Sequence, residues 1–185
     1  MNRITELFLT AGLMLVAAPL MIVLWLILAG GNGSPIFWSE RVGRNNRIFK
    51  MPKFRTMVPE APLVATHLMD HPEKYLTRVG KWIRAFSLDE IPQFFCVLRG
   101  QMALVGPRPA LFNQMDLIHL RTMAGVHQVC PGITGLAQVM GRDELSVREK
   151  VCWDEEYCRR RSLSLDLRIL WLTLIKVISQ KGIRH

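Results

Sequence analysis

LFLTAGLMLVAAPLMIVLWLILA, residues 7–29, is an apolar run of 23 residues in which Thr10 is the only polar side chain. A helix needs about 20 apolar residues to span the hydrocarbon core of a bilayer. A secretory signal peptide has a shorter apolar stretch and a small-x-small cleavage site, and no such site clearly follows this run. The run therefore predicts a retained membrane anchor, which we place at residues 1–33.

Pro19 lies near the middle of this run. Because proline removes one helical hydrogen bond and clashes with the preceding turn, it predicts a kink. One arrangement is a spanning helix with a tolerated kink. The other is a re-entrant helix that breaks at Ala18-Pro19 and leaves the membrane on the side where it entered. The second keeps Arg3 and the basic chain that follows on one side, as the positive-inside tendency favours.

The chain has a formal net charge of +9 over 185 residues. Its length suits one domain, residues 34–185, with the anchor appended. The positive charge indicates an anionic partner: nucleic acid, anionic lipid headgroups or phosphorylated small molecules. The anchor favours membrane lipids and phosphorylated molecules, so we expect no nucleic-acid partner. The four cysteines lack CxxC spacing, which is typical of free thiols in a reducing cytosol.

Residues 34–185 predict an α-rich α/β fold with short strands. Strand character is found at 36–38 and 48–51, on either side of a turn at 43–46. Helical spacing covers four further segments, the first interrupted by Pro92: 76–98, 110–125, 145–161 and 167–180.

The segment 130–142 has three glycines and a proline, which predicts a loop that includes a short strand. Ser164 and Asp166 are candidate caps of the last helix, 167–180. That helix is apolar almost all round, so it suits either a core position or the membrane surface.

SLDEIPQ, residues 87–93, places Asp89 beside Glu90 in a basic part of the chain. Consecutive helical residues point about 100° apart, so the two carboxylates cannot act as one symmetric pair. They can reach a site from two directions, one as a nucleophile and the other as a ligand for a divalent cation. For an Asp-Glu pair taken alone, the more common interpretation is two surface acids near a helix start capped by Ser87.

Four elements combine basic residues with turns: KFRTM (53–57), IRAFSLDE (83–90), VGPRP (105–109) and GITGLAQVMGR (132–142). The arginine fork matches phosphate oxygens, and glycine-rich turns let backbone N–H groups approach an anion. Neither a P-loop nor an HExxH motif occurs. A pocket that holds a diphosphate beside carboxylates needs a metal. Mg²⁺, with Mn²⁺ as an alternative, binds through one or two carboxylates and substrate phosphates.

KFRTM, RVGKWIRAFSLDEIPQ, ALVGPRP, PGITGLAQVMGR and the closing helix, in this order, resemble the bacterial sugar transferases, specifically the small monotopic phosphoglycosyl transferases. The resemblance covers nearly the whole chain. It implies a catalytic sugar transferase domain at 34–185 on the cytoplasmic face of the bacterial plasma membrane, and a re-entrant anchor before it.

The resemblance also implies a reaction. Asp89 would attack the β-phosphate of a UDP-sugar, release UMP and keep the phosphosugar. A polyprenol phosphate such as undecaprenyl phosphate would then accept it and form a polyprenol-diphosphate sugar. Glu90 matches the Mg²⁺-binding acid, and Arg84 matches a base beside the catalytic pair.

Further positions carry over from the family. Arg108 and Arg142 match arginines that contact phosphate. Lys53 and Asp154 match other functional positions. The chain departs from the family's usual pattern at three places. Cys130 stands where the family usually has a base, Leu136 where it often has Trp, and Asp143 where it often has Asn.

Two other functions compete with the transferase. A membrane-bound hydrolase could use the same acids and Mg²⁺ to cleave nucleotide-sugars or lipid diphosphates. A non-catalytic basic adaptor could hold acidic partners at the membrane, but it gives no reason for adjacent acids among so many bases or for Arg108 between two prolines. The motifs specify neither the sugar nor the oligomeric state.

Overall fold

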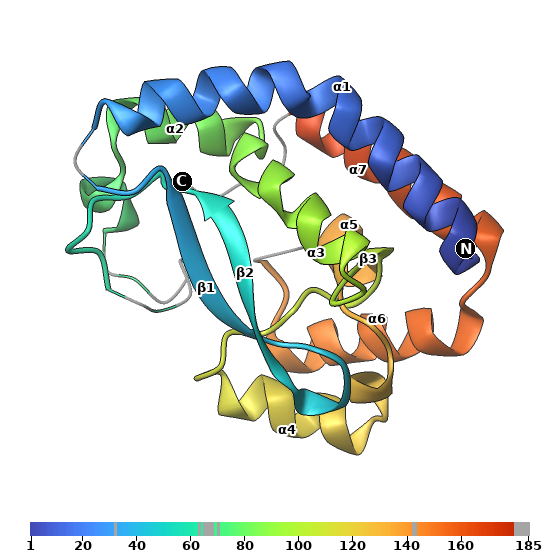
Figure 1. Cartoon of the computed structure of the whole chain (residues 1–185). Helices are drawn as coiled ribbons and strands as arrows, with labels where there is room; N and C mark the ends of the chain where they lie inside the picture. Colours follow the sequence, from blue (N-terminus) through green and yellow to red (C-terminus); the bar gives the residue numbers. More distant parts are fainter. Residues whose placement is uncertain (32, 63, 65–68, 70, 142–143, 180–185) are drawn as a thin grey trace.

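Figure 1 shows the computed structural model of the chain, which describes residues 1–179 except 32, 63, 65–68, 70 and 142–143. Helices dominate, and the strands form two separate two-stranded sheets. The predicted α-rich mixture with short strands is confirmed. The elements described are α1 (Arg3–Ala29), β1 (Ile36–Val42), η1 (Arg44–Asn46), β2 (Ile48–Phe54), η3 (Pro72–Tyr75), α2 (Arg78–Ala85), η4 (Leu88–Gln93), α3 (Phe94–Leu98), β3 (Ala103–Val105), α4 (Met115–Met123), η5 (Val126–Gln128), β4 (Gly132–Thr134), α5 (Leu136–Met140), α6 (Val147–Arg160) and α7 (Leu163–Ser179).

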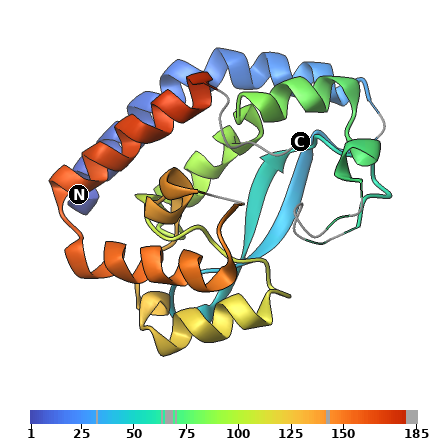
Figure 2. The same ribbon diagram turned by 180° about the vertical axis from the view of Figure 1, so that it is seen from behind.

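The apolar run forms most of α1, which the side chain of Asn2 caps by accepting a hydrogen bond from the Thr5 amide. By length and composition α1 could cross a membrane, and little of it is buried. The helix continues through Ala18 and Pro19 instead of breaking there. Both views show that it bends partway along (Figures 1 and 2). A proline inside a helix produces a kink of this kind.

Both halves of α1 contact the rest of the chain. Near its start, the buried Glu6 accepts a 2.8 Å hydrogen bond from the Leu104 amide, and Arg3 donates to the Val97 carbonyl. Near its end, Leu24 packs with Phe54 and Ile83 in a small apolar cluster. The contacts of one bent helix therefore reach the same compact domain at two separate places.

The antiparallel hairpin β1-β2 aligns Ile36 with Phe54 and Val42 with Ile48. Its turn places Asn45 and Asn46 at positive φ, which asparagine tolerates better than most residues. The two predicted strands are confirmed, and each is longer than the sequence suggested, because pairing extends beyond the apolar residues that signalled it.

The second sheet brings two turn motifs together. β3 and β4 are parallel and align Ala103 with Gly132 and Val105 with Thr134. The loop that follows β3, residues 106–109, is called the GPRP loop below. A Cβ atom on Gly135 would lie 2.1 Å from the Gly106 carbonyl oxygen, so the two backbones approach as closely as glycine allows.

The main core surrounds β3. It includes Val97, Met102, Leu104, Tyr157 and Ile169, all nearly inaccessible to solvent. The Tyr157 hydroxyl contacts the Val105 carbonyl at 3.0 Å and Asp166 at 2.9 Å. Tyr157 therefore links β3, α6 and α7 beneath the GPRP loop.

Several predicted boundaries were wrong. The segment 76–98 divides into α2, η4 and α3, with Pro92 inside η4. The segment 110–125 becomes helical only at Met115, because the Ala110 carbonyl instead accepts a hydrogen bond from the Val42 amide of β1.

Two other corrections concern ends of helices and loops. α7 begins at Leu163, and Ser162, rather than Ser164 or Asp166, accepts a hydrogen bond from an amide of its first turn. Asp166 is instead buried against Tyr157. The segment 130–142 contains the predicted strand, but Leu136–Met140 forms the short helix α5 where a loop was expected. Gly135 allows that helix to start against the GPRP loop.

Candidate functional site

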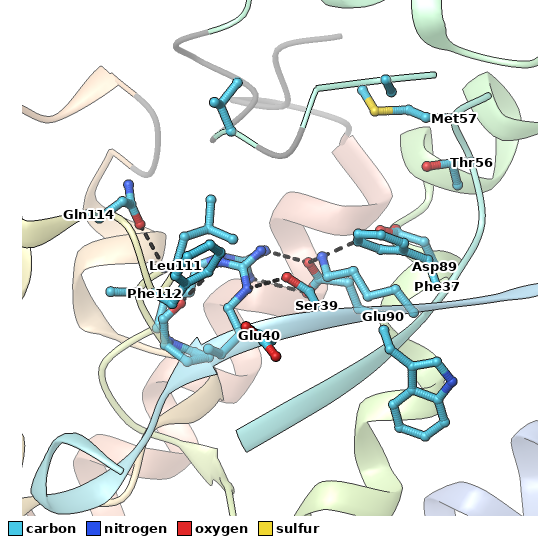
Figure 3. Close-up of a pocket in the computed structure, with 18 of the residues that line it drawn as sticks. Phe37, Ser39, Glu40, Thr56, Met57, Asp89, Glu90, Leu111, Phe112 and Gln114 are labelled. Atoms are coloured by element: carbon cyan, nitrogen blue, oxygen red, sulfur yellow. Dashed lines mark hydrogen bonds and ion pairs between the residues drawn. The ribbon is translucent and has the colours of Figure 1, made fainter. Parts of the chain in front are cut away.

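A cavity of about 540 Å³ lies between the β1-β2 hairpin, η4 and the segment that follows the GPRP loop. Figure 3 shows Asp89 and Phe37 on one side of it and Leu111, Phe112 and Gln114 on the other. The volume suits a small-molecule ligand. Eight basic and three acidic residues are among its described lining: Arg41, Lys50, Lys53, Arg55, Arg84, Arg108, Arg121 and Lys150, and Glu40, Asp89 and Glu90. The cavity therefore favours an anionic ligand.

The β1-β2 hairpin supplies one wall through strand alternation. Phe37, Ser39 and Arg41 are two residues apart on β1, so they share one face. Lys53 lies directly opposite Phe37 in the register and joins that face. All four line the cavity.

The SLDEIPQ segment supplies the floor. Ser87 adopts a left-handed conformation after α2 and turns the chain into η4; its side chain makes no helix cap. Leu88 packs on the cluster of Leu24, Phe54 and Ile83, which fixes the start of η4. Asp89 is only 4% exposed. The interpretation of two solvated surface acids is therefore wrong.

Three of the predicted residues form one ion cluster with Asp89. Lys53 Nζ lies 2.8 Å from Glu90 Oε1 and 3.6 Å from Asp89 Oδ2. Arg108 donates to both oxygens of Glu90, at 2.6 and 3.3 Å. Arg84 lines the same cavity. Tertiary structure thus gathers residues from three of the four basic elements around the acid pair.

Burial raises the pKa of Asp89, against the opposing charge of Lys53, and the neighbouring Glu90 raises it further. Burial likewise lowers the pKa of Lys53, against the opposing charges of Glu90 and Asp89. Both effects arise because water is largely excluded from the floor of the cavity. A carboxylate that is poorly hydrated and lies beside a cation such as Lys53 is suited to nucleophilic attack.

Arg41 is a candidate that the sequence analysis missed. Its guanidinium donates to Ser39 Oγ at 3.0 Å and to the Pro109 carbonyl at 3.2 Å, and both acceptors are neutral. Burial and the neighbouring charge of Arg108 lower the pKa of Arg41 to about 9, against the opposing charge of Glu90. The alternation of Ser39 and Arg41 along β1 was the available signal. A partly buried guanidinium beside a cavity is a ready partner for an anion.

Asp154 does not line the cavity. It is 1% exposed and binds the Arg121 guanidinium at 2.9 and 2.5 Å. Burial raises the pKa of Asp154, and Arg121 opposes that effect. Arg121 was missed as well, because nothing in the local sequence of α4 distinguishes it from a surface arginine.

Arg142 and Asp143 lie outside the described residues. Of the other two departures, Leu136 opens α5, and Cys130 Sγ lies 3.8 Å from the Gly100 carbonyl oxygen.

Mg²⁺ can be tested against the donors present. Among the described lining residues, the adjacent Asp89 and Glu90 are candidate ligands, and Glu40 is a third carboxylate on β1. The described residues contain no cluster of three or more potential metal ligands. Two carboxylates do not make a cage, but they suit a cation that reaches the site with a diphosphate and keeps phosphate oxygens as ligands. The two carboxylates therefore fit a Mg²⁺ ion that is also bound by substrate phosphate. Glu90 is the more exposed of the two.

The fold and site describe a protein with an apolar helix long enough to cross a membrane and a basic cavity that holds two adjacent carboxylates. Residues 1–180 match the family model described as "Bacterial sugar transferase". The chain therefore belongs to the bacterial sugar transferase family, whose members are enzymes of the transferase class.

Three relatives illustrate the match. The undecaprenyl-phosphate glucose phosphotransferase of Komagataeibacter xylinus is 40% identical over 182 residues, which cover 92% of this chain and 34% of that protein. The uncharacterized sugar transferase EpsL of Bacillus subtilis is 42% identical over 83% of this chain and 75% of its own length. The UDP-galactose-lipid carrier transferase of Erwinia amylovora is 35% identical over 89% of this chain and 37% of its own. The chain thus spans about a third of the length of the Komagataeibacter xylinus and Erwinia amylovora proteins.

Proposed function

We propose that this protein transfers a phosphosugar from a UDP-sugar to a polyprenol phosphate such as undecaprenyl phosphate, as a membrane step of bacterial glycoconjugate assembly. The observation that carries the proposal is the buried Asp89 beside Glu90 at the floor of a basic cavity, with Lys53 and Arg108 bound to the pair. The names of relatives support the substrate classes: undecaprenyl phosphate in one and a UDP-sugar in another.

The proposed chemistry has two phosphoryl transfers. In the first, an Asp89 oxygen bonds to the β-phosphorus, and the bond to the bridging oxygen breaks, so that UMP leaves and an acyl phosphate of the sugar stays on the enzyme. In the second, a phosphate oxygen of the polyprenol phosphate bonds to the same phosphorus and the Asp89 carboxylate leaves. A covalent intermediate divides one difficult step into two easier ones.

The cations around the cavity would stabilise the charge of the transferring group. Arg41, Arg84 and Arg108 approach the acid pair from β1, α2 and the GPRP loop. Positioned positive charge acts strongly here because the site excludes much of the water. Glu90 would hold Mg²⁺ together with the substrate phosphates, and the ion would neutralise charge on the diphosphate. Lys53 would then be free to orient Asp89.

We also propose that α1 is re-entrant and that the domain lies on the cytoplasmic face of the plasma membrane. Glu6 and Leu24 both contact this one domain, so both ends of α1 belong on the same side of the bilayer. α7 also supports contact between the domain and the membrane. It exposes a row of large apolar side chains at helical spacing: Leu163, Leu167, Trp171, Leu174 and Ile178. A membrane-bound acceptor requires a site at that surface.

Intact-protein mass spectrometry tests the covalent route. The full chain in nanodiscs is incubated with Mg²⁺ and a panel of UDP-sugars, including UDP-glucose and UDP-galactose, without acceptor. A mass gain of one phosphosugar that is absent in Asp89→Asn supports the proposal and identifies the donor. Turnover near wild type in Asp89→Asn would contradict it.

The same assay separates the alternatives. Release of UMP without an adduct, only once undecaprenyl phosphate is present, indicates direct transfer from donor to acceptor. Free sugar phosphate released without acceptor indicates a hydrolase. Binding of acidic partners that is unchanged in Asp89→Asn, with no turnover on any donor, indicates an adaptor.

A further inference from the structure

Only part of the GPRP loop can donate backbone hydrogen bonds. The Gly106 amide donates to the Thr134 carbonyl of β4 at 2.8 Å. Pro107 and Pro109 have no N–H group, and beyond Gly106 the contacts of the loop backbone are made by its carbonyl oxygens. The Pro107 carbonyl accepts from the Gly132 amide at 2.9 Å. The carbonyls of Arg108 and Pro109 accept from arginine side chains, Arg121 at 2.7 Å and Arg41 at 3.2 Å.

The donor to Arg108 is itself held in place. Arg121 projects from α4, and Asp154 of α6 binds its Nε and Nη2 at 2.9 and 2.5 Å. The third nitrogen, Nη1, is the one that reaches the Arg108 carbonyl. Because the guanidinium is planar and rigid, fixing two of its nitrogens fixes the direction of the third. Asp154 is almost fully buried, and the Arg121 side chain is 11% exposed, so solvent competes weakly with these bonds.

The orientation of Arg108 matters because its side chain reaches Glu90. Its two terminal nitrogens contact the two Glu90 oxygens at 2.6 and 3.3 Å. A continuous series of contacts therefore runs from α6 through α4 and the GPRP loop to the acid pair.

We propose that Arg121 and Asp154 act together as positioning residues, which orient the GPRP loop so that Arg108 is directed at Glu90 and at the phosphate of the donor. This rests on the proposed function for its activity readout. We call neither a catalytic residue. Asp154 is outside the cavity lining, and Arg121, although it lines the cavity, directs all three guanidinium nitrogens to Asp154 and the Arg108 carbonyl.

The difficulty in testing a buried ion pair is that removing one partner leaves an uncompensated charge and can unfold the protein. The double variant Arg121→Met/Asp154→Leu avoids this, because a packed apolar pair of similar volume is often neutral or stabilising. It removes the bond to the Arg108 carbonyl while leaving no buried charge behind. Arg121→Lys is the conservative companion: it keeps the charge, but one ammonium cannot reproduce the planar fork.

Three quantities are measured on the full chain in nanodiscs: the Tm, the rate of UMP release with UDP-glucose or UDP-galactose and undecaprenyl phosphate, and hydrogen–deuterium exchange of residues 104–112. We expect the double variant to keep a Tm near wild type and to lose about 10- to 100-fold in kcat/KM, the range of one charge-assisted hydrogen bond. Exchange at the Arg108, Ala110 and Leu111 amides should rise. The rate of Arg121→Lys should also stay below the wild-type rate, because keeping the charge without the planar fork is not enough to orient the loop.

A matched control removes an exposed ion pair from the outer face of the same helix. Arg159 and Glu156 form such a pair on α6, and Arg159 is 73% exposed. Arg159→Gln/Glu156→Gln should leave both the rate and the exchange of residues 104–112 unchanged.

The outcomes are separable. Wild-type rate and wild-type exchange in a folded double variant would overturn the positioning role. A loss of rate that parallels the loss of Tm across the variants would also overturn it. A pair that only stabilises the fold would lower the rate and the Tm together. If the wild-type chain releases no UMP with any donor, the proposed function fails, and the exchange measurement still decides the positioning role.

Discussion

Arg108 binds Glu90 through two nitrogens, at 2.6 and 3.3 Å, across the floor of the cavity. A base expected to contact phosphate is thus paired with the acid expected to hold the metal. Lys53 occupies the same Glu90 oxygen at 2.8 Å. If the proposed function holds, binding of a diphosphate with its cation would exchange these pairs: Arg108 would contact phosphate oxygens, and Glu90 would help to hold the cation.

Glu90→Gln should change the response to Mg²⁺. The amide keeps the shape of the side chain but loses the negative charge that binds a cation. We expect the Mg²⁺ concentration for half-maximal rate to rise by at least about tenfold, which corresponds to about 1.4 kcal/mol, or activity to be lost. UMP release measured over a Mg²⁺ titration checks this. An unchanged Mg²⁺ dependence would exclude Glu90 as a ligand.

Arg41→Met should weaken donor binding. The variant removes a partly buried positive charge near Glu90 and Arg108 and keeps the apolar bulk. We expect the KM for the UDP-sugar to rise about 10- to 100-fold, from the loss of one charge-assisted interaction. Arg47→Met is a suitable control, because Arg47 is exposed at the hairpin turn and outside the cavity lining. Equal KM values in the two variants would contradict a role of Arg41 in donor binding.

Gly135→Ala should destabilise the fold. The new Cβ would lie 2.1 Å from the Gly106 carbonyl oxygen, so the GPRP loop and the start of α5 must separate. Overpacking of this kind costs about 1–3 kcal/mol, which lowers the Tm by about 3–10 °C in a chain of this size. Thermal unfolding measures it. Gly12→Ala, inside α1 where a Cβ meets nothing within 4 Å, should leave the Tm unchanged or raise it, because alanine favours a helix over glycine. A wild-type Tm in Gly135→Ala would contradict the close approach.

The two ends of α1 should lie on one side of the membrane. In a variant whose native cysteines are replaced, Thr5→Cys and Ser34→Cys should both react with an impermeant maleimide in inside-out vesicles, and neither in right-side-out vesicles. Ala18→Cys, within the apolar run, should react in neither. Labelling of Thr5→Cys and Ser34→Cys from opposite sides would establish a spanning helix instead.

The sequence by itself determined the features that depend on residue type and local order. A largely apolar run of 23 residues predicts α1. Short apolar runs on either side of a turn predict both strands of the hairpin. The SLDEIPQ segment with its basic neighbours indicates the acid pair. These signals are local, because hydrophobic periodicity and side-chain chemistry can be read without knowing what lies nearby.

Only the tertiary structure decided which bases reach the acids. Arg41 and Arg121 resemble surface arginines in their local context, yet they hold adjacent carbonyls of the GPRP loop. Asp154, 64 residues from Glu90, is connected to it through Arg121 and Arg108. Such contacts join elements that are distant in the chain, and their strength comes from burial, which the folded packing creates and local sequence does not encode.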